Sequence, residues 1–134
     1  MKPISLKTAL RANGIFSIAC AVDLLLFSAP IAKAMGAVAP WILQAVGVAL
    51  VLWALSLMWV SSRPVIHQTL VKGVVVADLG WVLGTIVLLI ALPGVFTALG
   101  SLMLVGVAFV VLVIALLQGK ALANLYPKSE LLAR

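Results

Sequence analysis

Two aspartates stand within strongly apolar stretches of the sequence, where a carboxylate could hold a proton or a cation. Asp23 lies in "SIACAVDLLLFSAP" at residues 17–30, and Asp78 lies in "ADLGWVLG" at residues 77–84. An unpaired carboxylate is costly to remove from water, so an acid inside a membrane span is a functional hypothesis by default. The functional hypothesis is that Asp23 binds a cation or relays a proton. The alternative is a protonated Asp23 that forms one structural hydrogen bond between helices.

The composition indicates which solvent surrounds these acids. Hydrophobic residues make up 66% of the chain and charged residues 9%, whereas soluble domains are about half apolar and about a quarter charged. The sequence therefore predicts that the chain is embedded in the lipid bilayer, which is its first expected partner. The net charge is +6, but the sequence shows no basic face with interleaved aromatics, so we expect no nucleic-acid partner. One Cys and one His cannot build a metal cage or ligate a haem from two sides, and we expect no metal or cofactor.

Four apolar segments are long enough to cross a bilayer, which takes about 20 helical residues. They are residues 12–31, 40–60, 74–92 and 96–117. Short connections between them predict a single all-α domain, a membrane-spanning antiparallel four-helix bundle that runs up-down-up-down. A faint repeat links "KAMG" at residues 33–36 with "TALG" at residues 97–100. It indicates either two similar helical hairpins or chance agreement between common residues.

The distribution of Lys and Arg predicts the orientation of this bundle. Only Lys33 falls in a connection on one side of the predicted membrane. The other side carries Lys2, Lys7, Arg11, Arg63, Lys72, Lys120, Lys128 and Arg134. Because cytoplasmic loops retain positive charge, both termini are predicted to lie in the cytoplasm.

The depths of the two acids in the bilayer follow from helical rise. Asp23 is far from Arg11 and Lys33, which places it near the midplane, whereas Asp78 is about 9 Å beyond Lys72. A shared-proton carboxylate pair is therefore not expected. We expect Asp78 to be structural, with Arg11 or Asn13 as its hydrogen-bond partner.

A polar stripe on the first span is expected to face the bundle interior, because lipid offers no hydrogen-bond partner. Its members are Asn13, Ser17, Cys20 and, with some rotation, Asp23. Gln118 stands at the end of the fourth span, where we expect it to form a hydrogen bond at the membrane interface.

Small residues form a seam on the third span. The seam consists of Gly73, Ala77, Gly80 and Gly84, at intervals of four, three and four residues. Small residues let helix backbones approach closely in lipid. The seam could join two copies of the chain, but packing against the first or fourth span of the same chain is the favoured interpretation.

Two tryptophans, Trp53 and Trp81, lie within predicted spans. They could stack on a ligand such as a quinone or an aromatic cation. Packing or lipid-facing bulk is the favoured interpretation, because aromatic residues dominate buried area in general.

Three segments, "RANGIFS", "ADLGWVLG" and "ALLQ", resemble a group of small four-span bacterial membrane proteins described only as integral membrane proteins of unknown function. The resemblance implies a bacterial inner-membrane location. Small multidrug-resistance transporters are also four-span chains with an acid in the first span, although "CAVDLLL" around Asp23 does not match their usual surroundings.

The sequence carries no nucleophile–base–orienter set, so we do not expect an enzyme. The leading hypothesis is a non-catalytic membrane protein, an accessory subunit or assembly factor that binds other membrane subunits. The alternative is a homodimeric proton-coupled transporter of cationic compounds, with Asp23 as the coupling acid. Asp78 and Trp81 are the other candidate binding residues.

Overall fold

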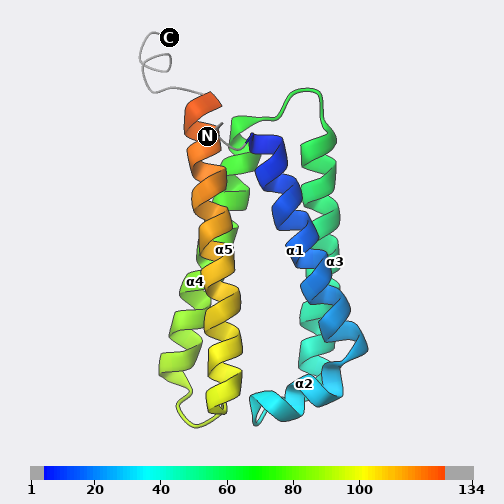
Figure 1. Cartoon of the computed structure of the whole chain (residues 1–134), viewed down its shortest axis with the longest axis vertical. Helices are drawn as coiled ribbons and strands as arrows, with labels where there is room; N and C mark the ends of the chain where they lie inside the picture. Colours follow the sequence, from blue (N-terminus) through cyan, green and yellow to red (C-terminus); the bar gives the residue numbers. More distant parts are fainter. Residues whose placement is uncertain (1–4, 126–134) are drawn as a thin grey trace.

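The chain folds into helices joined by short connections (Figure 1). The computed structural model describes residues 5–125. The helices in this range are α1 (Leu6–Leu26), α2 (Ser28–Met35), α3 (Pro40–Ser62), α4 (Gln68–Ala91) and α5 (Ala98–Leu125). All but α2 are long and apolar enough to cross a membrane. The chain is therefore an all-α integral membrane protein built on a four-helix bundle, as the sequence predicts.

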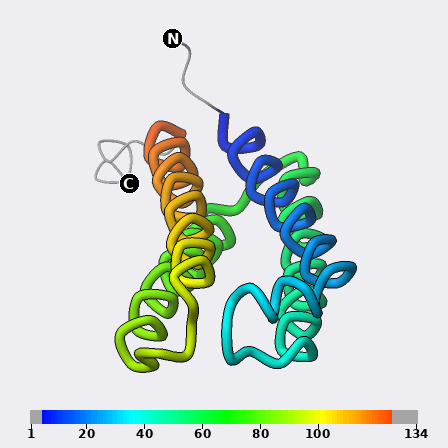
Figure 2. The backbone as a smooth tube through the Cα atoms, turned by 60° about the horizontal axis from the view of Figure 1, so that its bottom comes forward, coloured from blue at the N-terminus to red at the C-terminus, as the bar shows by residue number. Residues whose placement is uncertain are grey.

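The four long helices form two hairpins that meet along α1 and α5. In Figure 1, α1 and α4 run from the end that carries the N-terminus, and α3 and α5 return to it. Helix α1 packs mainly against α3, helix α4 packs mainly against α5, and α1 contacts α5 between the pairs. Figure 2 shows the same two pairs from another side. This arrangement brings side chains of α1, α4 and α5 together although they are far apart in the sequence.

The first predicted span, residues 12–31, differs most from the structure, which divides it into α1 and α2. Helix α1 ends at Leu26, four residues before Pro30. Proline lacks an N–H and its ring clashes with the carbonyl of the fourth residue before it, so α1 cannot continue through this turn. The last hydrogen bond of α1 runs from the Phe27 N–H to the Asp23 carbonyl at 2.9 Å, and α2 begins at Ser28.

The other long helices match most of each predicted span, and α3, α4 and α5 each extend beyond one end of it. Helix α3 begins at Pro40, where the missing N–H is harmless. Helix α4 begins at Gln68 rather than residue 74, and α5 continues to Leu125 rather than ending at residue 117. Helical hydrogen bonds do not require apolar side chains, so hydropathy marks the membrane-embedded part of a helix and not its ends.

Small residues lie where α1 and α3 make their closest contact. A Cβ built on Gly14 would lie 2.7 Å from Met58 Cε, and one on Gly47 would lie 2.9 Å from Leu25 Cγ. Backbones approach closely at such positions, which favours helix association in lipid. The small residues of this contact are Gly14, Ala21, Gly47 and Ala54.

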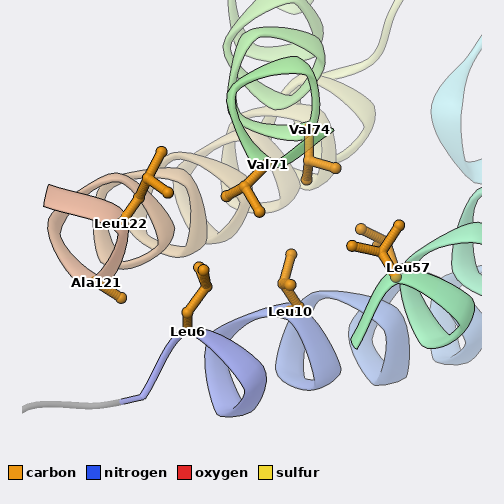
Figure 3. Packing of buried hydrophobic residues seen from close by; sticks show 8 residues of the cluster. Leu6, Leu10, Leu57, Val71, Val74, Ala121 and Leu122 are labelled. Carbon is orange, nitrogen blue, oxygen red and sulfur yellow. The ribbon is translucent and has the colours of Figure 1, made fainter. Parts of the chain in front are cut away.

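A hydrophobic cluster closes the bundle at the end where the N-terminus lies. Figure 3 shows its side chains pointing toward one another from all four long helices. The cluster consists of Leu6, Leu10, Leu57, Val60, Val71, Val74, Ala121 and Leu122. It joins the two hairpins at this end of the bundle.

Backbone hydrogen bonds join the two hairpins at the opposite end. The Ala37 N–H donates to the Val95 carbonyl at 2.9 Å, and the Thr97 N–H donates to the Met35 carbonyl at 2.8 Å. A Cβ added to Gly100 would overlap the Met35 backbone. The α2–α3 and α4–α5 connections are therefore held together at a junction that leaves no room for a side chain at position 100.

Candidate functional site: a polar cluster beside an intramembrane cavity

Three polar side chains from three helices meet inside the bundle. Asn13 of α1 donates through Nδ2 to Asp78 Oδ2 of α4 at 2.7 Å and to Gln118 Oε1 of α5 at 2.9 Å. Gln118 donates through Nε2 to the same Asp78 oxygen at 2.9 Å. The exposed fractions are 2% for Asn13, 5% for Asp78 and 0% for Gln118. A closed triangle of hydrogen bonds therefore links both hairpins, and we call it the polar cluster.

The hydrogen bonds of the polar cluster converge on one oxygen of the Asp78 carboxylate. Both hydrogens of the Asn13 amide are engaged, one by Asp78 and one by Gln118. The Ser17 hydroxyl donates to Asn13 Oδ1 at 3.4 Å. Asp78 Oδ2 accepts two amide hydrogens, whereas Oδ1 accepts none from the residues that the structure describes. Among the described residues, the uncommitted groups of the cluster are therefore Asp78 Oδ1 and one hydrogen of Gln118 Nε2, and of these two residues Asp78 alone lines the cavity described below.

Helical spacing places the polar cluster directly next to the hydrophobic cluster. Each polar side chain lies three or four residues from a member of the hydrophobic cluster, and this spacing keeps the two on the same helix face. The pairs are Leu10 and Asn13, Val74 and Asp78, and Leu122 and Gln118. The hydrophobic cluster therefore covers the polar cluster on the side of the chain termini.

A cavity of about 290 Å³ adjoins the polar cluster, with walls from all four long helices. Asn13, Ser17 and Asp78 supply its polar wall, and most of the remaining wall is apolar. Trp53 of α3 and Trp81 of α4 both line it. Two candidate binding residues, Asp78 and Trp81, are thus brought to one cavity.

The structure confirms the expected hydrogen bond between Asn13 and Asp78. Arg11, the other expected partner, is exposed. Gln118 was expected to form a hydrogen bond at the end of the fourth span. It does form hydrogen bonds, to Asn13 and Asp78, but it does not end its helix, because α5 continues past it to Leu125. Its burial in the polar cluster was not predicted.

Asp23 does not join this site. Its side chain is exposed and lies in the last turn of α1, next to the break at Phe27. The prediction that the polar stripe faces the interior is right for Asn13 and Ser17, which are buried, and wrong for Asp23. The midplane depth assumed one unbroken helix over residues 12–31, and the early end of α1 instead places Asp23 near the far end of the bundle.

The small-residue seam of α4 also differs from the favoured interpretation. All four seam residues are exposed. A Cβ added to Gly73, Gly80 or Gly84 would meet nothing within 4 Å in the described part of the chain. The three seam glycines therefore do not pack against α1 or α5, and the fourth seam residue, Ala77, lines the cavity.

The basic side chains gather where the prediction places them along the helices. Lys7 and Arg11 are at the start of α1, Arg63 and Lys72 flank the α3–α4 connection, and Lys120 is near the end of α5. These helix ends lie together in Figure 1, and α2, which carries Lys33, lies at the opposite end. Three basic residues that the prediction places on the same side lie outside the described residues: Lys2, Lys128 and Arg134.

Within residues 5–125, no three His, Cys, Asp or Glu side chains are grouped so that they could hold a metal ion. The geometry instead offers a carboxylate oxygen, aromatic walls and a small apolar volume. Comparison with protein-family models, curated proteins and solved structures finds no match for this chain.

Proposed function

We propose that this integral membrane protein is a non-catalytic accessory subunit or assembly factor of a membrane complex. Its partner is a transmembrane helix of another membrane protein, which packs on the α4 seam. The observation that carries the proposal is the exposure of Gly73, Ala77, Gly80 and Gly84. They form one helix face with room for a neighbouring backbone.

The physics of helix association in lipid supports this choice of surface. Lipid tails are as apolar as leucine, so helices associate through close packing rather than through burial of apolar area. The small residues of the α1–α3 contact already serve this purpose inside the chain, whereas a Cβ added to Gly73, Gly80 or Gly84 of the α4 seam would meet no described atom within 4 Å. Gly73 also lines an apolar groove of about 620 Å³ between α3 and α4. A partner helix on α4 would extend the bundle there.

The proposed location is the bacterial inner membrane, with both termini in the cytoplasm. Support comes from the gathering of Lys and Arg at one end of the bundle and from the positive-inside rule. On this orientation, the α3–α4 connection is cytoplasmic and α2 faces the periplasm.

The test is affinity purification of the tagged chain from its native membrane, followed by identification of the bound proteins. Gly80→Leu should remove the partner, because a branched side chain would hold the backbones apart. Gly106→Leu is the matched control, since Gly106 is an exposed α5 glycine with nothing within 4 Å of an added Cβ. Equal partner recovery with both variants would overturn the proposed surface. Recovery of only a second copy of the chain would replace the accessory role with self-association.

The alternative, a homodimeric proton-coupled transporter that uses Asp23, has less support. Asp23 is exposed at the end of α1, and its carboxylate forms no hydrogen bond to any residue in the described range. A coupling acid binds a proton and the cationic substrate in turn, so it must lie in the binding cavity, and the acid that lines the cavity is Asp78.

A further inference from the structure

We infer that the cavity beside the polar cluster binds a small organic monocation, with its positive group at Asp78 Oδ1 and its apolar part between Trp53 and Trp81. The cavity shares one residue, Ala77, with the α4 seam, but the inference does not depend on the proposed association. The ligand class is a quaternary ammonium ion or a similar cation that bears one aromatic or branched apolar group.

The hydrogen-bond pattern of the polar cluster selects a positively charged ligand. The Asn13 amide has no hydrogen left for a ligand, and the Ser17 hydroxyl hydrogen is directed to Asn13. Asp78 lines the cavity, and its Oδ1 atom accepts no hydrogen bond from a described residue. A quinone presents carbonyl oxygens, which are acceptors, and Asn13, Ser17 and Asp78 leave no free donor for it on the polar wall of the cavity. A cation complements the carboxylate without needing a donor from the protein.

The rest of the cavity wall suits an organic cation better than a metal ion. Calcium takes about six to eight oxygen ligands and magnesium about six, and Asp78 Oδ1 is the only uncommitted carboxylate oxygen among the described cavity residues. Trp53 and Trp81 supply indole faces, which attract cations through the ring quadrupole. An organic cation can therefore bind the carboxylate through its positive group and contact the indole rings through its apolar group.

The volume limits the size of the ligand. Sites for drug-sized ligands occupy about 300–1,000 Å³, and this cavity, at about 290 Å³, lies at the small end of that range. Benzyltrimethylammonium, which has one ring and one quaternary nitrogen, is therefore a suitable probe. Its neutral isostere neopentylbenzene has a carbon atom in place of the nitrogen and isolates the contribution of charge.

The experiment measures binding of both probes to the full chain in bilayer discs made of zwitterionic lipid. Replacing Trp41 and Trp59 by Phe leaves Trp53 and Trp81 as the only tryptophans of the four in the sequence, so fluorescence quenching reports on the cavity. Benzyltrimethylammonium should quench saturably, and Asp78→Asn should weaken its binding at least tenfold. Neopentylbenzene should bind both forms equally.

Asp78→Asn is chosen because the fold should tolerate it. The new amide oxygen can accept from Asn13 and Gln118 as Oδ2 does, and the new NH₂ group then takes the place of Oδ1. Circular dichroism and the unfolding temperature of the variant verify that the fold is retained. Absence of saturable binding to the unsubstituted cavity, or equal affinity of the folded Asp78→Asn variant for the cation, would overturn the inference.

A second pair of variants separates indole contacts from the carboxylate contact. Trp81→Leu, measured by calorimetry, should weaken binding of the cation about three- to thirtyfold, the range expected for loss of a cation–π contact. Trp41→Leu is the matched control, because Trp41 is exposed and is not a lining residue of this cavity. Equal weakening by the two substitutions would contradict the placement of the ligand between the tryptophans.

Discussion

Asp78 shows how one carboxylate can serve both folding and binding. Its Oδ2 atom accepts from Asn13 and Gln118 and thereby links α4 to α1 and α5. Its Oδ1 atom is left for the cavity. Inside a protein, hydrogen bonds are strengthened by the low dielectric, and a buried polar group without a partner is costly for the same reason. Each member of the polar cluster therefore depends on the other two.

Replacing Gln118 by Leu tests this dependence at the level of a single side chain. The substitution removes two hydrogen bonds, to Asn13 and to Asp78, and leaves part of their polar capacity buried. We expect a loss of about 1–3 kcal/mol in the free energy of unfolding, the usual cost of an unsatisfied buried group. Denaturant titration in mild detergent measures it.

Ser17→Ala is the control for this prediction. It removes only the 3.4 Å bond to Asn13 Oδ1, which is too long for a strong hydrogen bond. We expect its cost to be below about 0.5 kcal/mol. Similar costs for the two variants would mean that the triangle of Asn13, Asp78 and Gln118 contributes nothing beyond an ordinary polar contact.

The hydrogen-bond partners of a residue could be predicted from the sequence where they depended only on its depth in the bilayer. Asn13, at the start of the first span, lies at nearly the same predicted depth as Asp78, and this sufficed to predict their hydrogen bond. The bonds of Gln118 to Asn13 and Asp78 were missed because hydropathy does not mark where α5 ends. Asp23 was misplaced because its depth depends on the break that Pro30 imposes on α1.

Helix ends, rather than helix centres, decide how the elements meet. Helix α2 directs the chain away from α1, and its last residue, Met35, accepts a backbone hydrogen bond from Thr97. Gly36 follows with a φ angle of 121°, a conformation that glycine adopts more readily than other residues. The two halves of the faint repeat, at residues 33–36 and 97–100, thus contact one another at this junction.

Gly100→Ala tests the junction between the two hairpins. Its methyl group would overlap the Met35 backbone, which cannot move aside as a flexible side chain could. Overpacking of this kind costs typically about 1–3 kcal/mol, so we expect a lower unfolding temperature in detergent.

Gly106→Ala on the same helix provides the comparison. Nothing lies within 4 Å of an added Cβ at that position, and alanine favours helix over glycine by about 0.8–1 kcal/mol. We expect this variant to be unchanged or more stable. If Gly100→Ala were as stable as Gly106→Ala, the hairpins would not be in close contact at Met35.

The prediction of the elements succeeded in type and in the number of spanning helices, and failed at their boundaries and at the short helix α2. Four apolar stretches sufficed to identify four spanning helices, because backbone groups in lipid must be satisfied within the helix. Which face of a helix packs could not be read from small residues alone. Gly14 and Gly47 pack closely inside the chain, whereas Gly80 on α4 does not.

The whole molecule has one strongly basic end and one nearly uncharged end. This asymmetry predicts its orientation, which labelling in intact cells can measure. In a chain with Cys20→Ser, we expect Lys33→Cys to react with a membrane-impermeant maleimide before lysis. Val65→Cys, in the exposed α3–α4 connection, should react only after lysis. The reverse pattern would place the termini outside the cytoplasm.

The long sequence separations within the polar cluster determine the order in which the protein can be completed. Asn13 is 65 residues before Asp78 and 105 residues before Gln118. At about 5–20 residues per second, Asn13 is synthesised about 5–20 s before its last partner exists. For the first 65 of the 105 intervening residues the Asn13 amide has neither partner, and until Gln118 is made Asp78 is the one partner of the two that exists. The polar cluster therefore cannot form before α5 has been synthesised. A product truncated before Gln118 would keep the Asn13 amide without that partner, which would mark the chain for degradation.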